Sequence, residues 1–251
     1  MAAFLRAWAG AEADGAAAAA LAARAEEHER AAGAVAAAMA ARLWHWEGDG
    51  RGWWRAFDVK GGAPVAARTY QLAWPAWEGI GSPEQVAACL RELLAPDMRG
   101  AAGIRSTSAA DPRFSLEDAI VPYSIWRGPV WVNVNCCLCY ALARGGLKAE
   151  ALGVARGLVA ALAADVRANG AMHECYHPDT GAPTCTASKV RREPLRAPKK
   201  PRPPKTKPNP NPTTPVTLPK PSLTKQGFLS WNMMAASILE NLEAGVDPTA
   251  L

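Results

Sequence analysis

Residues 126–170 read WRGPVWVNVNCCLCYALARGGLKAEALGVARGLVAALAADVRANG, and this stretch predicts two antiparallel helices. Pro129 favours the start of a helix over roughly 129–144, and Gly145-Gly146 favours its end. A second helix over 147–168 follows at once and stops at Asn169-Gly170, which is a C-cap pattern. Two helices joined by so short a turn form an αα-hairpin.

The rest of the chain repeats this alternation of helices and loops, with little strand-like patterning. Residues 15–43 are rich in Ala, Leu, Glu and Arg, which are good helix formers. Ser82-Pro83-Glu84-Gln85 is a typical helix start. The remaining expectations are a glycine-rich loop or short hairpin over Trp44–Gly62, a helix over 66–74 stopped by Pro75, a helix from Ser82 to Leu94, irregular chain over 97–122 and a helix over 229–244. The sequence therefore predicts an all-α fold, either a helical toroid or a solenoid.

Charge is concentrated in one segment. Residues 189–225 hold eleven Lys or Arg and one acid, Glu193, so the rest of the chain sums to −5 within a total of +5. The surrounding stretch 186–226 contains eleven prolines and almost no large apolar residues, which predicts a disordered insertion. An anionic partner, such as nucleic acid or an anionic membrane, would suit its charge, but the favoured interpretation is a solvated insertion without a nucleic-acid partner.

The remaining composition narrows the class of protein. Six cysteines include three within residues 136–139, which reads as helix packing rather than a zinc or disulfide site. No signal peptide or membrane span is evident, and the thiols slightly favour a cytoplasmic location. Ten tryptophans exceed the four Phe and four Tyr, which suits either a large core or stacking on sugar rings. No cofactor is expected.

Five short motifs follow one another along the chain. They are Leu43-Trp44, WxGI at 77–80 with SPEQ at 82–85, WRGPVWxNxN at 126–135, ExYxPxTG at 174–181 and FxSW at 228–231. In this order they resemble glycoside hydrolase family 63, which includes the processing α-glucosidase of N-glycan trimming and the mannosylglycerate hydrolases. The resemblance covers nearly the whole chain except 186–226. It implies an (α/α)6 barrel, of which residues 1–185 and 227–247 would form a part.

The resemblance also implies hydrolysis with inversion by two carboxyl groups about 6.5–9.5 Å apart. The general base would be Glu174, the glutamate of the ExY motif. The general acid would be an aspartate in a GxDxxPR-like motif, and this sequence contains no such motif. The pattern supplies roughly six or seven helices, too few to close the toroid, so a truncated or separately encoded part of a barrel is expected.

Each candidate residue has a structural alternative. Glu174 could be an acid on a solvent-facing loop, and Arg127 could be a cation that ties Asp118 rather than a fork for a sugar hydroxyl. The other candidate substrate contacts are Trp77, Trp126, Trp131, Tyr176 and Trp231, and the tryptophans could equally be core. His173 and His177 flank Glu174, but no further histidine lies nearby in sequence, so no metal site is expected.

Two functions remain open at this point. The first is an inverting α-glycosidase, acting on a glucosyl or mannosyl linkage or a sugar–glycerate, with Glu174 as the base that activates water. The second is a catalytically inactive helical scaffold or carbohydrate-binding remnant whose basic segment binds partners. The Glu174 motif favours the first and the missing acid favours the second, so whether this polypeptide is itself an enzyme stays open.

Overall fold

The computed structural model describes residues 1–12, 14–116, 126–184 and 231–246, apart from the side chain of Trp231. The predicted insertion 186–226 lies outside these residues. The elements in chain order are α1 (Ala2–Ala11), α2 (Gly15–Arg42), β1 (Trp44–Trp46), η1 (Gly48–Gly50), β2 (Gly52–Trp54), η2 (Tyr70–Ala73), α3 (Trp74–Trp77), α4 (Pro83–Leu93), β3 (Val130–Trp131), α5 (Val132–Arg144), α6 (Lys148–Asn169), β4 (Cys175–Tyr176), η4 (Trp231–Met233) and α7 (Met234–Ala244). Helices dominate, as the sequence predicts, and within the described ranges none has the length and apolarity to cross a bilayer.

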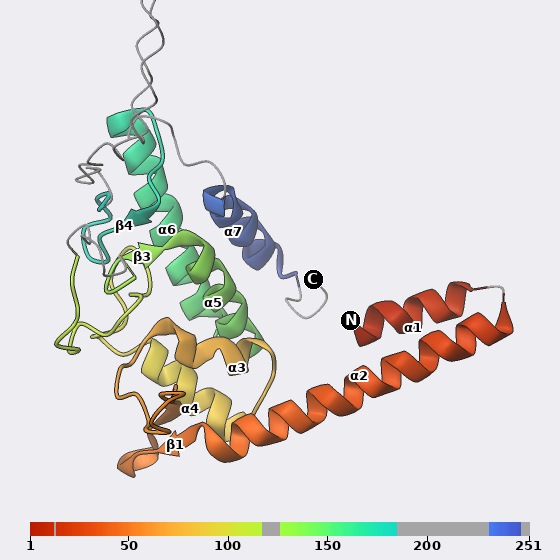
Figure 1. The fold of residues 1–251 in the computed structure, drawn as a ribbon. Coiled ribbons are helices and arrows are strands. Elements are labelled where there is room, and N and C mark those ends of the chain that lie inside the picture. The colour runs from red at the N-terminus through yellow and green to blue at the C-terminus, as the bar shows by residue number, and fades with distance from the viewer. Residues whose placement is uncertain (13, 117–125, 185–230, 247–251) are drawn as a thin grey trace, which may run out of the picture.

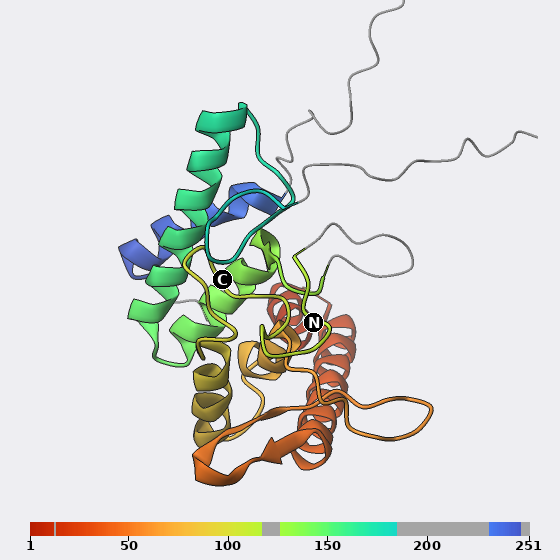
Figure 2. The same cartoon turned by 90° about the vertical axis from the view of Figure 1, so that its left-hand side faces the viewer.

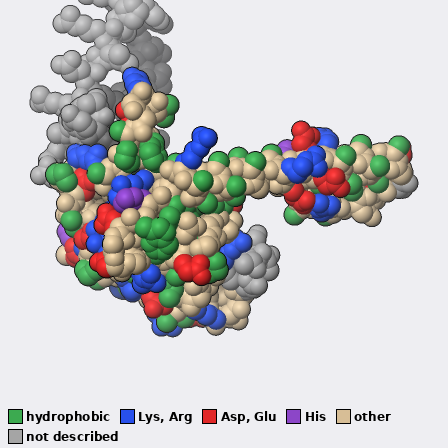
Figure 3. Space-filling view, turned by 90° about the horizontal axis from the view of Figure 1, so that it is seen from below, with side chains coloured by type: hydrophobic (Ala, Val, Ile, Leu, Met, Phe, Trp, Pro, Cys, Tyr) green, Lys and Arg blue, Asp and Glu red, His purple; other side chains and the backbone are tan. Residues whose placement is uncertain are grey.

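Helices α1 and α2 form an arm that stands away from the rest of the molecule (Figures 1 and 3). The carboxylate of Asp14 caps α2 by accepting hydrogen bonds from the backbone N–H groups of Ala16 and Ala17. Arg6 and Glu29 join the two helices in an ion pair. Because the arm is alanine-rich, it buries little: within α1 only Leu5 is buried, and within α2 only Ala25.

The glycine-rich segment after α2 is a hairpin, as predicted. Strands β1 and β2 pair antiparallel, with Trp44 opposite Trp54. A charge network ties this hairpin to α4: Glu92 accepts hydrogen bonds from Arg51 at 2.7 Å and from Arg68 at 2.7 Å. The hydrogen bond from Arg51 is the main cause of a lowered pKa at Glu92, so this buried carboxyl stays ionised and paired.

One predicted helix is displaced along the chain and another is predicted to begin too early. Residues 66–69 are not helical, because Thr69 bridges to Thr107, and helical structure runs instead from Tyr70 through Pro75 to Trp77. Pro75 does not stop this helix because it lies in the first turn, where a missing N–H costs nothing. Helix α5 begins at Val132 rather than near Pro129, because Val130 and Trp131 pair with β4.

The other helix ends follow the predicted signals. Ser82 and Gln85 form a reciprocal capping box at the start of α4. Helix α5 ends at Gly145, and α6 ends at Gly170, which takes the left-handed conformation that glycine favours. Helices α5 and α6 therefore form the predicted hairpin.

The core lies where α5 packs between α6, α7 and the α3–α4 region (Figure 1). Leu138 and Leu142 on α5 and Leu158 on α6 are almost completely buried. Cys136 and Cys139 are buried beside them, so these thiols fill the core as the sequence predicts. Burial raises the pKa of Cys136 to about 12, which keeps the thiol protonated.

The irregular connections gather on one side of the helices. Segments 95–116, 126–131 and 170–184 lie together there, in front of the helices in Figure 2. Ala102 N–H donates to the carbonyl of Pro178 at 2.7 Å, which joins the first of these segments to the last. Three stretches far apart in sequence thus form one loop layer, which carries the predicted site.

Candidate functional site

The WRGPVW segment brings two candidate tryptophans face to face. The rings of Trp126 and Trp131 are stacked, with centroids 3.6 Å apart and planes 5° from parallel. Trp131 is only 2 % exposed, whereas Trp126 is half-buried. Trp131 therefore packs as core in this structure, and Trp126 is the member of the pair with surface available to a ligand.

The backbone of this segment is held from three directions. Gly128 N–H donates to Ser106 Oγ at 2.8 Å, Thr107 Oγ1 donates to the carbonyl of Trp126 at 3.3 Å, and Ser115 N–H donates to the carbonyl of Arg127 at 2.9 Å. A Cβ atom on Gly128 would lie 2.7 Å from the carbonyl oxygen of Ser115. The motif needs glycine here because the chains approach so closely.

Strands β3 and β4 bring the WRGPVW motif and the ExYxPxTG motif side by side. Val130 pairs with Tyr176 and Trp131 pairs with Cys175 in antiparallel register. Glu174 directly precedes the paired Cys175, so the pairing brings its segment beside the stacked tryptophans. The sequence predicts a loop at this position and does not reveal the pairing, because each strand is only two residues long.

Glu174 is a half-buried carboxyl group without a protein partner among the described residues. Burial raises its pKa above that of an ordinary glutamate. A carboxylate with these properties keeps its lone pairs available and binds a proton more strongly than an exposed one. It is suited to accept a proton from a water molecule.

A buried aspartate that the sequence does not single out organises the chain around Glu174. Asp165 on α6 accepts hydrogen bonds through Oδ2 from His173 N–H at 2.9 Å and from the Tyr176 hydroxyl at 2.8 Å, and His173 Nδ1 lies 2.8 Å away. Asn169 Nδ2 donates to its other oxygen at 2.7 Å. Burial acts to raise the pKa of Asp165, but these hydrogen bonds outweigh it, and the pKa is lowered.

Tyr176, a predicted substrate contact, is buried within this network. It is 1 % exposed, and burial together with the adjacent Asp165 carboxylate raises the pKa of its hydroxyl. The hydroxyl donates to Asp165 and accepts from His173 N–H at 3.0 Å. In this structure Tyr176 therefore has no exposed surface for a sugar and acts as support.

The residues after Tyr176 form a rigid turn. His177 Nδ1 accepts hydrogen bonds from the backbone N–H groups of Asp179 and Thr180, at 3.1 and 3.3 Å. Asp179 forms an ion pair with the buried Arg105. Both histidines beside Glu174 thus have structural partners, and no group of three metal-ligating side chains occurs within the described ranges.

Most candidate aromatic residues belong to one row of rings. From the Trp126–Trp131 stack the row continues to Tyr70 at 5.9 Å, then Trp74 at 5.6 Å, then Trp77 at 5.4 Å. Tyr70 and Trp74 are members that sequence reasoning missed. Trp77 is 36 % exposed and ends the row, while the side chain of Trp231 lies outside the described part of the chain.

The polar residues of the WRGPVW region divide into two kinds. Asn135 is fully buried and holds the preceding loop: its Oδ1 accepts from Ile104 N–H at 2.7 Å and its Nδ2 donates to the carbonyl of Ile104 at 3.0 Å. Asn135 thus fixes the position of the loop that contains Ile104. Arg127 is half-buried, and Asp118, its predicted structural partner, lies outside the described residues.

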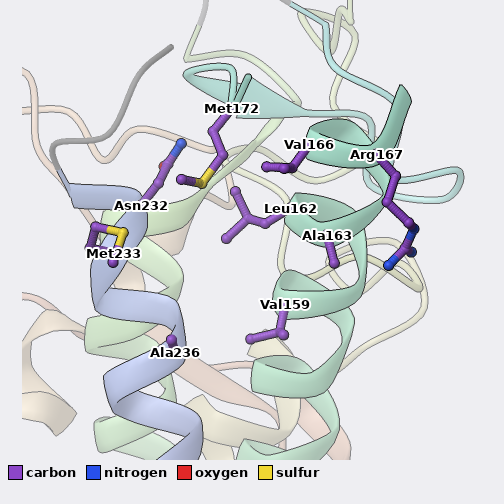
Figure 4. Close-up of a pocket in the computed structure, with 9 residues that line it drawn as sticks. All are labelled: Val159, Leu162, Ala163, Val166, Arg167, Met172, Asn232, Met233 and Ala236. Carbon is purple, nitrogen blue, oxygen red and sulfur yellow. The ribbon is translucent and has the colours of Figure 1, made fainter. Parts of the chain in front are cut away.

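An apolar pocket of about 390 Å³ lies between α6 and α7, next to the Glu174 segment (Figure 4). Val159, Leu162 and Val166 on α6 face Met233 and Ala236 on the other side. Of the lining side chains only Asn232 and Arg167 are polar. A sugar needs several hydrogen-bonding groups, so this pocket is not suited to be the carbohydrate site.

Comparison of folds gives a solved relative with the same architecture. Neutral trehalase Nth1 from Saccharomyces cerevisiae has 14 % identity and a TM-score of 0.53, and the match covers 90 % of this chain and 34 % of that protein. A mannosylglycerate hydrolase of family GH63 from Thermus thermophilus, solved with glucose, has 23 % identity and a TM-score of 0.44, over 68 % of this chain and 37 % of that one. The chain thus spans about a third of these proteins. The fold is all-α and corresponds to part of an (α/α)6 barrel.

Sequence comparison identifies the family. No curated protein matches the chain. The family described as the mannosylglycerate hydrolase MGH1-like glycoside hydrolase domain matches residues 4–191, which is most of the chain. This range includes the WRGPVW and ExYxPxTG motifs on which the resemblance to family 63 depends. The chain therefore belongs to the mannosylglycerate hydrolase MGH1-like glycoside hydrolase domain family.

Proposed function

We propose that this chain provides the general-base side of an inverting α-glycosidase site, with Glu174 as the base. The observation that carries the proposal is the state of Glu174. It is half-buried, its pKa is raised by burial, and it has no protein partner among the described residues. In single displacement an ionised carboxylate takes a proton from the water that attacks the anomeric carbon.

The raised pKa suits this role. A base whose pKa lies closer to the working pH accepts the water proton more readily, as long as it remains ionised before the reaction. The hydrogen-bond donors near Glu174 are already engaged with Asp165, so they do not compete for the carboxylate. Water is then the natural hydrogen-bond partner of Glu174.

We assign the sugar contacts to the exposed part of the aromatic row. Trp126 and Trp77 offer ring surface, and the guanidinium of Arg127 can bind hydroxyl pairs in a fork. Trp131 and Tyr176 support these contacts from the core. Trp231 remains a candidate from its FxSW motif. The family description names a mannosylglycerate hydrolase, which supports a mannosyl–glycerate substrate, and an α-linked glucosyl group is the alternative that we propose beside it.

The general acid has to come from polypeptide outside this sequence, because no GxDxxPR-like motif occurs in it. A substrate whose leaving group needs no protonation separates the two roles. α-Mannosyl fluoride and α-glucosyl fluoride are such substrates, since fluoride leaves as an anion. With them, the base alone can drive hydrolysis.

The test is hydrolysis of these fluorides by the purified chain, with the anomeric form of the first product followed by NMR. We expect the β-sugar as first product, and we expect Glu174→Gln to reduce the rate at least about 100-fold. The exposed Glu240→Gln variant is the matched control and should retain the rate of the unmodified chain. Equal rates for Glu174→Gln and the unmodified chain would disprove the role of Glu174.

The alternative function is a carbohydrate-binding scaffold without catalysis, and the missing acid motif favours it. In that case the chain would bind mannose or glucose but leave the fluorides intact. Binding is measured by calorimetry on the same preparation. Saturable sugar binding without fluoride hydrolysis would therefore select the scaffold over the enzyme.

A further inference from the structure

The backbone of His173, the residue before Glu174, is held through both its N–H and its carbonyl group. The N–H of His173 donates to Asp165 Oδ2 at 2.9 Å and lies 3.0 Å from the Tyr176 hydroxyl oxygen. The carbonyl of His173 accepts a hydrogen bond from Asn232 Nδ2 at 2.7 Å. The backbone immediately before Glu174 thus has partners on both its donor and its acceptor.

These contacts come from three separate elements. Asp165 lies on α6, Tyr176 on β4, and Asn232 on η4, which leads into α7 (Figure 1). All three side chains are buried: Tyr176 is 1 % exposed, and Asp165 and Asn232 are each 2 % exposed. Burying a charged carboxylate is unfavourable unless it is well hydrogen-bonded, and Asp165 meets this condition through His173, Tyr176 and Asn169.

We propose that Asp165, Tyr176 and Asn232 are positioning residues that hold the backbone of His173 and so keep the carboxylate of the adjacent Glu174 half-buried. This inference rests on the proposed function of Glu174. None of the three touches substrate in this role, because each acts through the backbone of His173. A misplacement of about 1 Å in a catalytic group can reduce turnover about 100-fold, which gives such a clamp its value.

Removal of the Tyr176 hydroxyl tests the proposal most directly. This hydroxyl donates a hydrogen bond to Asp165 and accepts one from the N–H of His173, so it links the carboxylate to the backbone of His173. Replacement by Phe removes both contacts and keeps the ring and the charge of Asp165. An Asp165 variant would instead also remove a negative charge near Glu174, which would change its titration directly. Tyr176→Phe therefore tests positioning alone.

The experiment follows Glu174 in the whole chain by carbon NMR with isotope-labelled glutamate carboxyl groups, assigned with Glu174→Gln. In Tyr176→Phe we expect the pKa of Glu174 to fall toward that of an exposed glutamate, because the released segment lets water reach the carboxylate. We also expect the His173 backbone amide, which loses one of its two acceptors, to exchange with solvent at least about tenfold faster. The side-chain hydroxyl of Tyr140 provides the matched control, since it accepts from Asn241 at 3.2 Å elsewhere in the core, and Tyr140→Phe should change neither quantity.

A second variant protects the test against a folding defect. Asn232→Ala removes the donor to the His173 carbonyl and leaves the Asp165–Tyr176 bond in place, and it should move both quantities in the same direction. Folding is checked by a cooperative thermal transition. Unchanged titration and exchange in folded Tyr176→Phe and Asn232→Ala would overturn the proposal. A shift in these variants without fluoride hydrolysis by the unmodified chain would support the clamp and refute the catalytic role.

Discussion

At the scale of single residues, the carboxyl groups of Glu174 and Asp165 have pKa values that are shifted in opposite directions. Glu174 is removed from water without receiving protein donors, so its pKa rises. Asp165 is buried more deeply, but donors from His173, Tyr176 and Asn169 reverse the effect of burial. Glu174 therefore binds a proton more strongly than an exposed glutamate, and Asp165 binds one more weakly than an exposed aspartate.

The raised pKa of Glu174 predicts a pH-dependent gain in stability for Glu174→Gln. Between the ordinary glutamate pKa of about 4.3 and the raised value, the folded state binds more protons than the unfolded chain, so its stability falls as pH rises. Glutamine stays neutral and escapes this loss. The variant should melt at a higher temperature than the unmodified chain at neutral pH, and the difference should vanish below about pH 4. Thermal denaturation across this pH range measures it, and a difference that is the same at every pH would contradict the assignment.

Glu174 could be found from sequence, whereas Asp165 could not. Glu174 stands in the ExYxPxTG motif, so the residues next to it in sequence are enough to mark it as a candidate. Asp165 lies in an alanine-rich helix, and its role depends on contacts with residues that the chain reaches only after the helix ends. One signal was present: a negative charge near the C-terminal end of a helix is unfavourable unless other donors compensate it. An acid at this position is therefore expected to have hydrogen-bond donors nearby.

At the scale of elements, the stability of the site depends on close approach of loops rather than on helix packing alone. The segment at Gly128 runs so near the carbonyl of Ser115 that a methyl group does not fit. The same segment leads into β3 and hence into the pairing with β4. A defect at Gly128 should therefore propagate to the Glu174 strand.

Gly128→Ala tests this dependence. We expect a loss of about 1–3 kcal/mol in the free energy of unfolding, because the added Cβ forces two backbone segments apart. Gly33→Ala is the matched control: Gly33 lies within α2 with nothing near its missing Cβ, and alanine there should stabilise by about 0.5–1 kcal/mol. Urea denaturation of both variants gives the two numbers. A Gly128→Ala variant as stable as the unmodified chain would contradict this, because it would show that the segments at Gly128 and Ser115 can move apart without loss of stability.

Elements with local end signals were predictable, and elements defined by distant partners were not. The capping box at Ser82 and the glycine at the end of α6 act within a few residues, so α4 and α6 were predicted nearly to the residue. Strands β3 and β4 have two residues each and exist only because they meet. The start of the helix expected over 66–74 was wrong for the same reason, since the bridge between Thr69 and Thr107 is a long-range contact.

At the scale of the whole molecule, the chain divides into a packed body and an arm. The body contains α3 to α7, the β1–β2 hairpin and the loop layer with the candidate site. The arm of α1 and α2 leaves Phe4, Trp8 and Val35 more than half exposed. Isolated helices gain little stability from propensity alone, so the arm depends on the contact between its two helices.

This division predicts that the body folds without the arm. A chain that starts at Met39 removes α1 and most of α2 but keeps the carbonyl that accepts the Leu43 N–H at 2.9 Å. Because the removed residues bury only Leu5 and Ala25, both within the arm, the thermal midpoint of the body should shift by no more than about 4 °C.

The control for this truncation is a defect inside the body. Leu90 on α4 is completely buried, and Leu90→Ala should cost about 2–5 kcal/mol, enough to lower the midpoint clearly. Both chains are followed by near-ultraviolet circular dichroism, which reports the packing of the tryptophans in the body. A truncated chain that melts as early as Leu90→Ala would mean that α2 supports the body by more than its visible contacts. An unshifted midpoint would allow the Glu174 titration and the fluoride assay to be carried out on the shorter chain, free of the exposed apolar arm.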